Sequence, residues 1–262
     1  MAEPVVLRPS ASVILVRDGD AGLETFMVRR HARSRVAPSA YVFPGGTVRG
    51  DDRAAFTEHG ETLAGALCSR ADTQLVADDA AAYYVSAVRE LFEEAGVLLA
   101  CDAGGRLLEV DEAYVALQER LAGARLALQA GDLALSSLLA DQDWRPAFDA
   151  LVPFSHWVTP AVLAARFDTR FFIGEMPPRQ AALHCTIETT EGIWISPRQL
   201  LDGEYNVVYA TAQHLRRIAG FAQVGELVEF ARTKAIRRVQ PEVVEAGSGL
   251  SVYLPPEIVD NW

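Results

Sequence analysis

One helical segment constrains this sequence more than any other. In residues 79–95 apolar side chains recur at helical spacing, and Glu90, Glu93 and Glu94 fall within about one 100° sector of that helix. The opposite side is apolar and consists of Ala81, Tyr84, Val85, Val88, Leu91, Phe92 and Ala95. Carboxylates three or four residues apart on a helix repel each other by a few tenths of a kcal/mol per pair, roughly. The segment therefore predicts a helix whose acidic side is either fully solvated or binds a hard divalent cation.

Glycines and acidic residues mark the surroundings of this helix. Gly96 stands where a residue in the left-handed conformation would end it, and Asp78 or Asp79 is a suitable N-cap. Upstream, a short strand-like run breaks into Gly45 and Gly46. Because glycine lets the backbone pass close to a ligand, this pair is expected to line a binding site.

Together these residues resemble the box of the Nudix hydrolases, G-x5-E-x7-R-E-U-x-E-E-x-G-U, in which U is apolar. Residues 89–97 match its second half at every fixed position, and Gly46 matches its opening glycine. Asp52 stands where the first glutamate is expected. The family spacing would then place the arginine at position 60 rather than 89, so 29 residues are inserted within the box. If the insertion lies earlier in the chain, Glu61 is the alternative to Asp52.

Further segments resemble one branch of this family. The inserted box is similar to that of peroxisomal-type coenzyme A diphosphatases, and so are residues 151–160 and 166–172, which follow a W-x-T-P…R-F-D-T-x-F-F pattern. Residues 188–195 resemble the strand in which Nudix proteins often carry a glutamate and a tryptophan. The resemblance implies an α/β fold, a Nudix α/β/α sandwich with a mixed sheet and added helical insertions.

The expected organisation is one elaborated domain. We expect the Nudix hydrolase domain over residues 1–205, with 51–78 as the insertion within the box and 110–145 as a helical cap. Residues 206–262 are expected to pack on the same domain as helices and a tail. The expected strands are 11–16, 25–29, 41–43, 167–173, 183–189 and a pair within 238–259. The expected helices, besides 79–95, are 52–58, 62–70, 111–130, 132–140, 207–221 and 224–236. The last two are amphipathic and leave room for a homodimer.

The resemblance implies roles for the box residues. Glu90, Glu93 and Glu94 would bind Mg²⁺ or Mn²⁺, and Arg89 would pair with the first box carboxylate and hold the helix to the glycine loop. The general base would be a box glutamate or an outside residue. Among outside residues we expect Glu175, on the loop after strand 167–173, with Glu188 as the second candidate.

A basic run precedes the glycines of this otherwise acidic chain. It consists of Arg29, Arg30, His31, Arg33 and Arg35. We interpret it either as a solvated loop or as a grip for a phosphate of the substrate, in which Arg29, Arg30 and Arg35 act together with Gly45 and Gly46.

Composition narrows the classes of partner. A net charge of −11 argues against unspecific binding to nucleic acid or to a membrane. Three scattered cysteines without C-x-x-C spacing indicate neither a disulfide framework nor a zinc site. The N-terminus lacks a signal-peptide pattern and no apolar run reaches about 18 residues. We therefore expect a cytoplasmic protein that acts on a small-molecule nucleotide.

The resemblance implies hydrolysis of a diphosphate linkage by attack of water at phosphorus. Coenzyme A or acyl-CoA is the expected substrate, and ADP-ribose or a dinucleotide is the alternative. A ligand-binding Nudix module without turnover is a third hypothesis. It is disfavoured because all three box glutamates are present.

Overall fold

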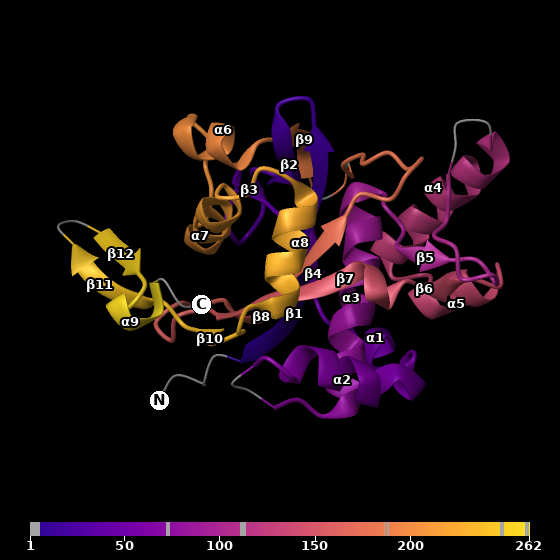
Figure 1. The fold of residues 1–262 in the computed structure, drawn as a ribbon, viewed down its shortest axis with the longest axis horizontal. Helices are drawn as coiled ribbons and strands as arrows, with labels where there is room; N and C mark the ends of the chain where they lie inside the picture. The colour runs from indigo at the N-terminus through magenta and orange to yellow at the C-terminus, as the bar shows by residue number, and fades with distance from the viewer. Residues whose placement is uncertain are drawn as a thin grey trace.

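A mixed sheet forms the centre of the computed structural model (Figure 1), which describes residues 6–71, 74–110, 114–185, 187, 189–246, 249–259 and 262. Its strand order is β10-β7-β8-β1-β2-β3, with β4 paired to β1 and β9 paired to β2. The pairs β1–β8 and β7–β10 are parallel, whereas β1–β2, β1–β4, β2–β3, β2–β9 and β7–β8 are antiparallel. The strands are β1 Leu7–Gly19, β2 Gly22–Arg30, β3 Tyr41–Val42, β4 Gly45–Thr47, β7 Leu151–Val158, β8 Arg166–Glu175, β9 Thr189–Ile195 and β10 Arg238–Val239.

Both faces of this sheet are covered, because the central strand is apolar on both sides. In β1, Val13 and Leu15 belong to one buried cluster, and Ile14 and Val16 belong to the other. Helix α3 (Ala77–Ala95) packs in the first cluster, and α7 (Tyr209–Ile218) and α8 (Val224–Thr233) pack in the second. The alternation of strand side chains thus produces the expected α/β/α sandwich with a mixed sheet.

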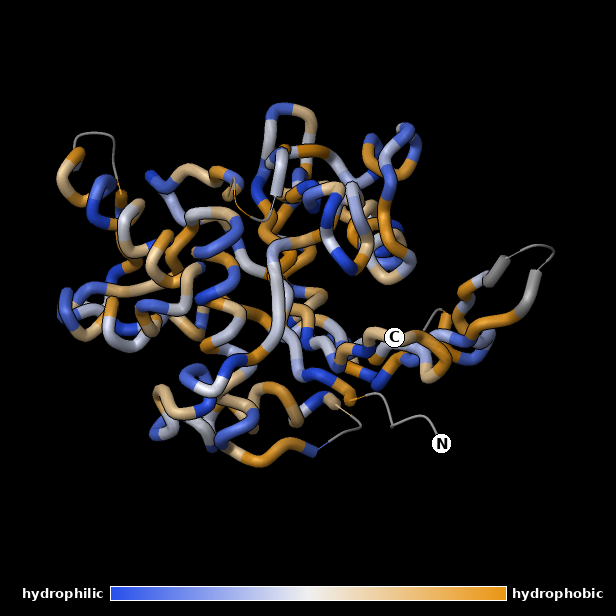
Figure 2. The backbone as a smooth tube through the Cα atoms, turned by 180° about the vertical axis from the view of Figure 1, so that it is seen from behind, coloured by the Kyte–Doolittle hydropathy of each residue, from blue (hydrophilic) through white to orange (hydrophobic). Residues whose placement is uncertain are grey.

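The insertions lie around this sandwich. The box insertion contains α1 (Gly50–Ala54), a 3₁₀ turn (Thr57–His59) and α2 (Gly60–Cys68). The cap expected at 110–145 contains α4 (Val115–Ala130) and α5 (Leu135–Ala140). The paired strands β5 (Ala100–Cys101) and β6 (Arg145–Pro146) flank it, and a 3₁₀ turn (Phe148–Ala150) follows. Helix α6 (Pro197–Asp202) follows β9, and the tail contains β11 (Glu242–Ala246), β12 (Gly249–Tyr253) and α9 (Pro256–Val259). Figures 1 and 2 show the hairpin β11–β12 projecting from the body of the molecule.

Three local expectations were wrong. The N-cap of α3 is Val76. Asp78 and Asp79 lie in the first helical turn instead, where their negative charges interact favourably with the positive end of the helix dipole. The strand expected at 183–189 begins only at Thr189, because Leu183 and Cys185 donate backbone hydrogen bonds to the last carbonyl groups of α3. Strand β7 was not anticipated: all its residues are buried, and alternation is therefore absent from its sequence.

The amphipathic helices α7 and α8 use their apolar sides within the chain. Leu215, Ile218 and Leu227 are completely buried in the second cluster, on the face of the sheet opposite α3. Intrachain packing therefore accounts for the pattern, and the homodimer stays a prediction. No helix in the described ranges is long and apolar enough to cross a lipid bilayer.

A residue near the end of the tail closes the second cluster. Trp262 is 2% exposed, and its ring centroid lies 4.9 Å from that of Trp157 and 4.9 Å from that of His214. The guanidinium carbon of Arg217 lies 4.5 Å from the same ring. The tail is therefore anchored by an aromatic side chain in the core.

Replacing Trp262 by alanine is expected to lower the free energy of unfolding by about 3–5 kcal/mol, because it leaves a large cavity in the core. Urea unfolding measures this change. Tyr114→Ala is the control, since Tyr114 is 58% exposed and its loss should cost less than about 0.5 kcal/mol. Equal losses in the two variants would contradict an anchoring role.

Candidate active site

The two glycines lie where helix α3 meets the sheet. Strand β4 pairs with β1 so that Gly45 faces Ser12 and Gly46 faces Ala11. A Cβ atom on Gly45 would lie 2.5 Å from the carbonyl oxygen of Ala11, and a Cβ on Gly46 would overlap the carboxylate of Glu90. Only glycine therefore allows the strand and the acidic side of the helix to approach this closely.

The three glutamates are brought together and buried. Glu90, Glu93 and Glu94 are 7%, 4% and 3% exposed. Oε2 of Glu94 accepts a hydrogen bond of 2.9 Å from the backbone N–H of Gly45. The acidic side of the helix is thus not solvated, because β4 and α1 cover it.

Arg89 holds this arrangement together. Its Nε and Nη2 atoms donate to the two oxygens of Asp52 at 2.9 and 2.8 Å, and Nη2 also donates to the carbonyl of Thr47. Its Nη1 donates to Oε1 of Glu90 at 2.7 Å and to Oε1 of Glu93 at 3.2 Å. Arg89 is 0% and Asp52 1% exposed, whereas Glu61 is exposed on α2. Asp52, and not Glu61, is therefore the carboxylate that pairs with the box arginine.

Burial and pairing act on the ionisation of these groups. Burial by itself would lower the pKa of Arg89, but the hydrogen bonds with Asp52 and the charges of Glu90, Asp52 and Glu93 raise this pKa well above its ordinary value. Burial raises the pKa of Glu90 to about 7, although Arg89 acts to lower it. At Glu90 the effect of burial on the pKa thus outweighs that of the neighbouring guanidinium.

A second arginine reaches the same carboxylates. Nη1 and Nη2 of Arg49 donate to Oε1 and Oε2 of Glu93, each at 2.9 Å, and Nη1 also donates to the carbonyl of Leu128 at 3.0 Å. Sequence reasoning missed Arg49. Its position between Gly46 and Asp52, inside the first half of the box, was the available signal.

Comparison with known proteins identifies the family. The sequence model of the NUDT19 Nudix domain matches residues 58–207, which is more than half of the chain. The chain belongs to the NUDT19 Nudix family. It is accordingly a Nudix diphosphohydrolase. The matched region contains the helix with Arg89 and the three glutamates.

Relatives of this Nudix hydrolase cover most of its length. The acyl-coenzyme A diphosphatase NUDT19 of Xenopus laevis is 24% identical over 95% of this chain and 74% of the relative. The human protein of the same name is 27% identical over 89% of this chain and 71% of its own length. The crystal structure of a Nudix hydrolase from Alicyclobacillus acidocaldarius superposes with a TM-score of 0.67 at 24% identity, covering 88% of this chain and 98% of that one. This structural likeness confirms the Nudix fold.

Nudix hydrolases generally use divalent metal cations, and the box residues fit such a group. Their donors are carboxylate oxygens, which hard cations prefer. They gather where a Cβ on Gly46 would collide with Glu90. In the described part of the chain, however, no three acidic, histidine or cysteine side chains surround a common point. The glutamates instead pair with donors of the chain: Glu90 with Arg89, Glu93 with Arg89 and Arg49, and Glu94 with the backbone N–H of Gly45.

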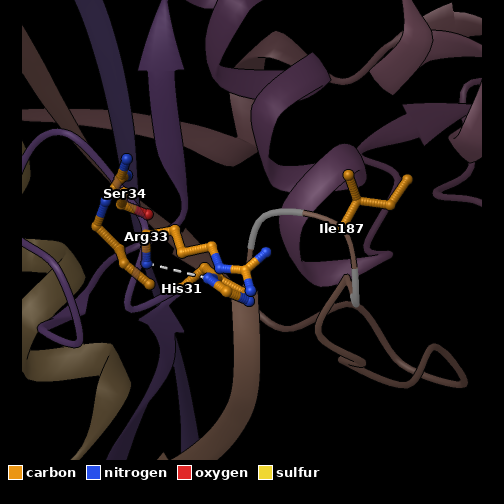
Figure 3. A pocket seen from close by; sticks show the side chains of 5 residues that line it. His31, Arg33, Ser34 and Ile187 are labelled. Carbon is orange, nitrogen blue, oxygen red and sulfur yellow. Dashed lines mark hydrogen bonds between the residues drawn. The ribbon is translucent and has the colours of Figure 1, made fainter.

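Only part of the basic run lines a common cavity in the fold. Arg30, His31, Arg33 and Ser34 line a cavity of about 420 Å³, with Ile187 across from them (Figure 3). Two arginines of the run do not take part in this lining. Arg29 lies 3.8 Å from a carboxylate oxygen of Glu191 and stacks on Tyr41, and Arg35 is exposed.

The first outside candidate for the general base does not join the box. Phe172 of β8 belongs to the cluster beneath α3, and Ile173 belongs to the opposite cluster. Strand alternation therefore directs the exposed Glu175 to the face opposite α3, and its role stays a prediction. Glu188 lies outside the described residues.

Asp52→Asn is expected to destabilise the protein by about 3–5 kcal/mol, because it leaves the guanidinium of Arg89 without its main buried partner. Chemical denaturation measures the loss. Glu61→Gln, which changes an exposed carboxylate nearby in the sequence, should leave stability unchanged. If the two variants unfold at the same denaturant concentration, Asp52 is not the structural carboxylate of the box.

Proposed function

We propose that this Nudix hydrolase cleaves the diphosphate linkage of coenzyme A or acyl-CoA, with Mg²⁺ or Mn²⁺ as its cofactor. The observation that carries the proposal is the buried set of Glu90, Glu93 and Glu94 packed on Gly45 and Gly46, in a chain whose relatives are named acyl-coenzyme A diphosphatases. Attack of water at phosphorus would form a new P–O bond and break the bridging P–O bond. The products would be a 3′,5′-ADP type of nucleotide and a phosphopantetheine.

The box glutamates would hold the cofactor. When bound, a divalent cation orients the attacking water and neutralises charge on the diphosphate oxygens. Carboxylates buried in a low-dielectric region favour such a ligand. Arg89 is already engaged by Asp52, Glu90 and Glu93, which supports a positioning role rather than contact with the substrate.

Proton transfer from the attacking water would need a general base. Glu93 and Glu90 are the candidates within the box, and Glu90 lies against Gly46. Glu175 remains the outside candidate. Glu175→Gln separates the two hypotheses, because it should preserve turnover if a box glutamate is the base.

Glu93→Gln is expected to lower kcat by at least about 100-fold, because it removes a charged oxygen ligand of the cofactor. It also weakens the ion pairs with Arg49 and Arg89, so kcat is compared at a temperature at which circular dichroism shows the variant to be folded. A substrate panel of coenzyme A, ADP-ribose, NADH and diadenosine polyphosphates, with Mg²⁺ and with Mn²⁺, provides the measurement. Glu61→Gln serves as the control. Full turnover in the Glu93 variant would refute the site. Faster hydrolysis of ADP-ribose or a dinucleotide than of coenzyme A would refute the proposed substrate. If no compound is hydrolysed, the result would support a ligand-binding module without turnover.

We further propose that the cavity lined by Arg30, His31 and Arg33 receives a peripheral phosphate of the nucleotide. Three basic side chains and the hydroxyl of Ser34 converge on this cavity, in an otherwise acidic chain. Guanidinium groups bind phosphate through charge-assisted hydrogen bonds. The 3′-phosphate of coenzyme A is a group of this kind that ADP-ribose lacks.

Arg33→Ala should therefore raise KM for coenzyme A by about tenfold, the effect of losing one charge-assisted hydrogen bond. Dephospho-coenzyme A lacks the 3′-phosphate, so its KM should change little in this variant. Arg35→Ala is the control, since Arg35 does not line the cavity. An equal rise in KM for coenzyme A and dephospho-coenzyme A would contradict binding of the 3′-phosphate in this cavity.

The compartment that we propose is the cytoplasm. Cys68, Cys101 and Cys185 are free thiols in the structure, which agrees with a reducing environment. The net charge of −11 agrees with a small-molecule substrate whose phosphates are bound through cations rather than through a basic surface.

A further inference from the structure

Arg49 makes an ion pair that occupies both oxygens of one box glutamate. Its two terminal nitrogens donate to Oε1 and Oε2 of Glu93 at 2.9 Å each, which is the parallel, bidentate geometry of a strong guanidinium–carboxylate pair. Both oxygens of Glu93 are therefore engaged by a cation that belongs to the chain itself. With the hydrogen bond from Arg89 to Oε1, three donors fill most of the acceptor sites of this carboxylate, so a metal ion that binds both of its oxygens must displace at least one of them.

The two box arginines differ in their freedom to move. Arg89 is 0% exposed and is held by Asp52, Glu90, Glu93 and the carbonyl of Thr47. The side chain of Arg49 is 32% exposed, and besides Glu93 its guanidinium donates to the carbonyl of Leu128. A partly exposed guanidinium can be hydrated again when its ion pair breaks. Arg49, rather than Arg89, can therefore release Glu93.

The surroundings of Arg49 do not depend on its staying in place. Leu128 lies in the last turn of α4, where the negative end of the helix dipole attracts a cation. Helix α4 is also held by Arg125, which donates to the carbonyls of Glu93 and Leu183 at 2.9 and 2.7 Å. Departure of Arg49 from Leu128 therefore leaves α4 tied to the end of α3.

The charges at the site favour an exchange of cations. Asp52, Glu90 and Glu93 are three buried carboxylates that pair with the guanidiniums of Arg89 and Arg49. A divalent ion carries twice the charge of the guanidinium that it would replace. It therefore neutralises the buried carboxylates more completely, whereas without metal the guanidinium keeps Glu93 from standing unpaired in a low-dielectric region.

We infer that Arg49 is an internal competitor of the divalent cation: it occupies Glu93 in the metal-free enzyme, and cation binding displaces it. This inference rests on the proposed role of Glu93 as a metal ligand. Arg49 thereby stabilises the free protein and sets the cation concentration at which the box is filled. It is a positioning residue, since it acts through Glu93.

Arg49→Met, which keeps the length of the side chain and removes its charge, tests the inference in the full-length protein. Mn²⁺ binding, followed by electron paramagnetic resonance of the free ion, should become about tenfold tighter because a charge-assisted pair no longer competes. The melting temperature without metal should fall, and the rise that Mn²⁺ produces should be larger than in the wild type. These two stability changes have opposite signs, which a merely structural residue would not produce.

Arg53→Met is the matched control. Arg53 lies in helix α1, which begins directly after the N-cap residue Arg49, and pairs with Asp79 at the surface, so its loss should leave Mn²⁺ affinity unchanged. Arg49→Lys provides a second test if the methionine variant fails to fold. It offers one ammonium in place of a bidentate fork, and its Mn²⁺ affinity should lie above that of the wild type.

The outcomes separate this inference from the proposed function. Equal or weaker Mn²⁺ binding in the Arg49 variants, with binding intact in the wild type, overturns the competition and leaves the metal site standing. Absence of Mn²⁺ binding in the wild type and in every variant overturns the metal site, and the competition with it.

Discussion

The buried ion pair between Arg89 and Asp52 is the interaction on which the rest of the site depends. One guanidinium without solvent exposure joins the insertion helix α1, the carbonyl of Thr47 in β4 and two glutamates of α3. Removing such charges from water costs several kcal/mol per ion, so the arrangement is stable only while every donor has an acceptor. The positions of Glu90 and Glu93 are therefore set by one buried guanidinium.

Burial of the acidic side of α3 has a physical reason that a surface helix would not have. The side chains of α3 opposite the glutamates fill the first cluster, between this helix and the sheet. Strand β4 and helix α1 cover the glutamates themselves. In this low-dielectric region each carboxylate requires a specific cation or N–H donor, and water cannot supply one. The site is thus prepared for strong interaction with positive charge, which a diphosphate-cleaving enzyme needs in order to bind a polyanion.

The sequence predicts those features that are local, and fails where partners are distant. Glu90, Glu93 and Glu94 could be placed on one side of a helix because their spacing alone decides it. Strand β7 could not be found, since burial on both faces removes alternation from its residues. The apolar residues after Ala182 resembled a strand, but their backbone instead satisfies the end of α3. Arg49 escaped notice because its partner lies 44 residues further along the chain.

The insertion separates the two halves of the box along the chain but not in space. Asp52 and Arg89 are 37 residues apart and still form a bidentate pair, and the entropy of closing a loop grows only slowly with its length. The site therefore requires contact between Asp52 and Arg89 in the folded protein, and not a fixed number of residues between them. A search pattern of constant spacing would recover only half of such a box, so enzymes with similarly divided boxes are best sought by the paired carboxylate and arginine in their folded structures.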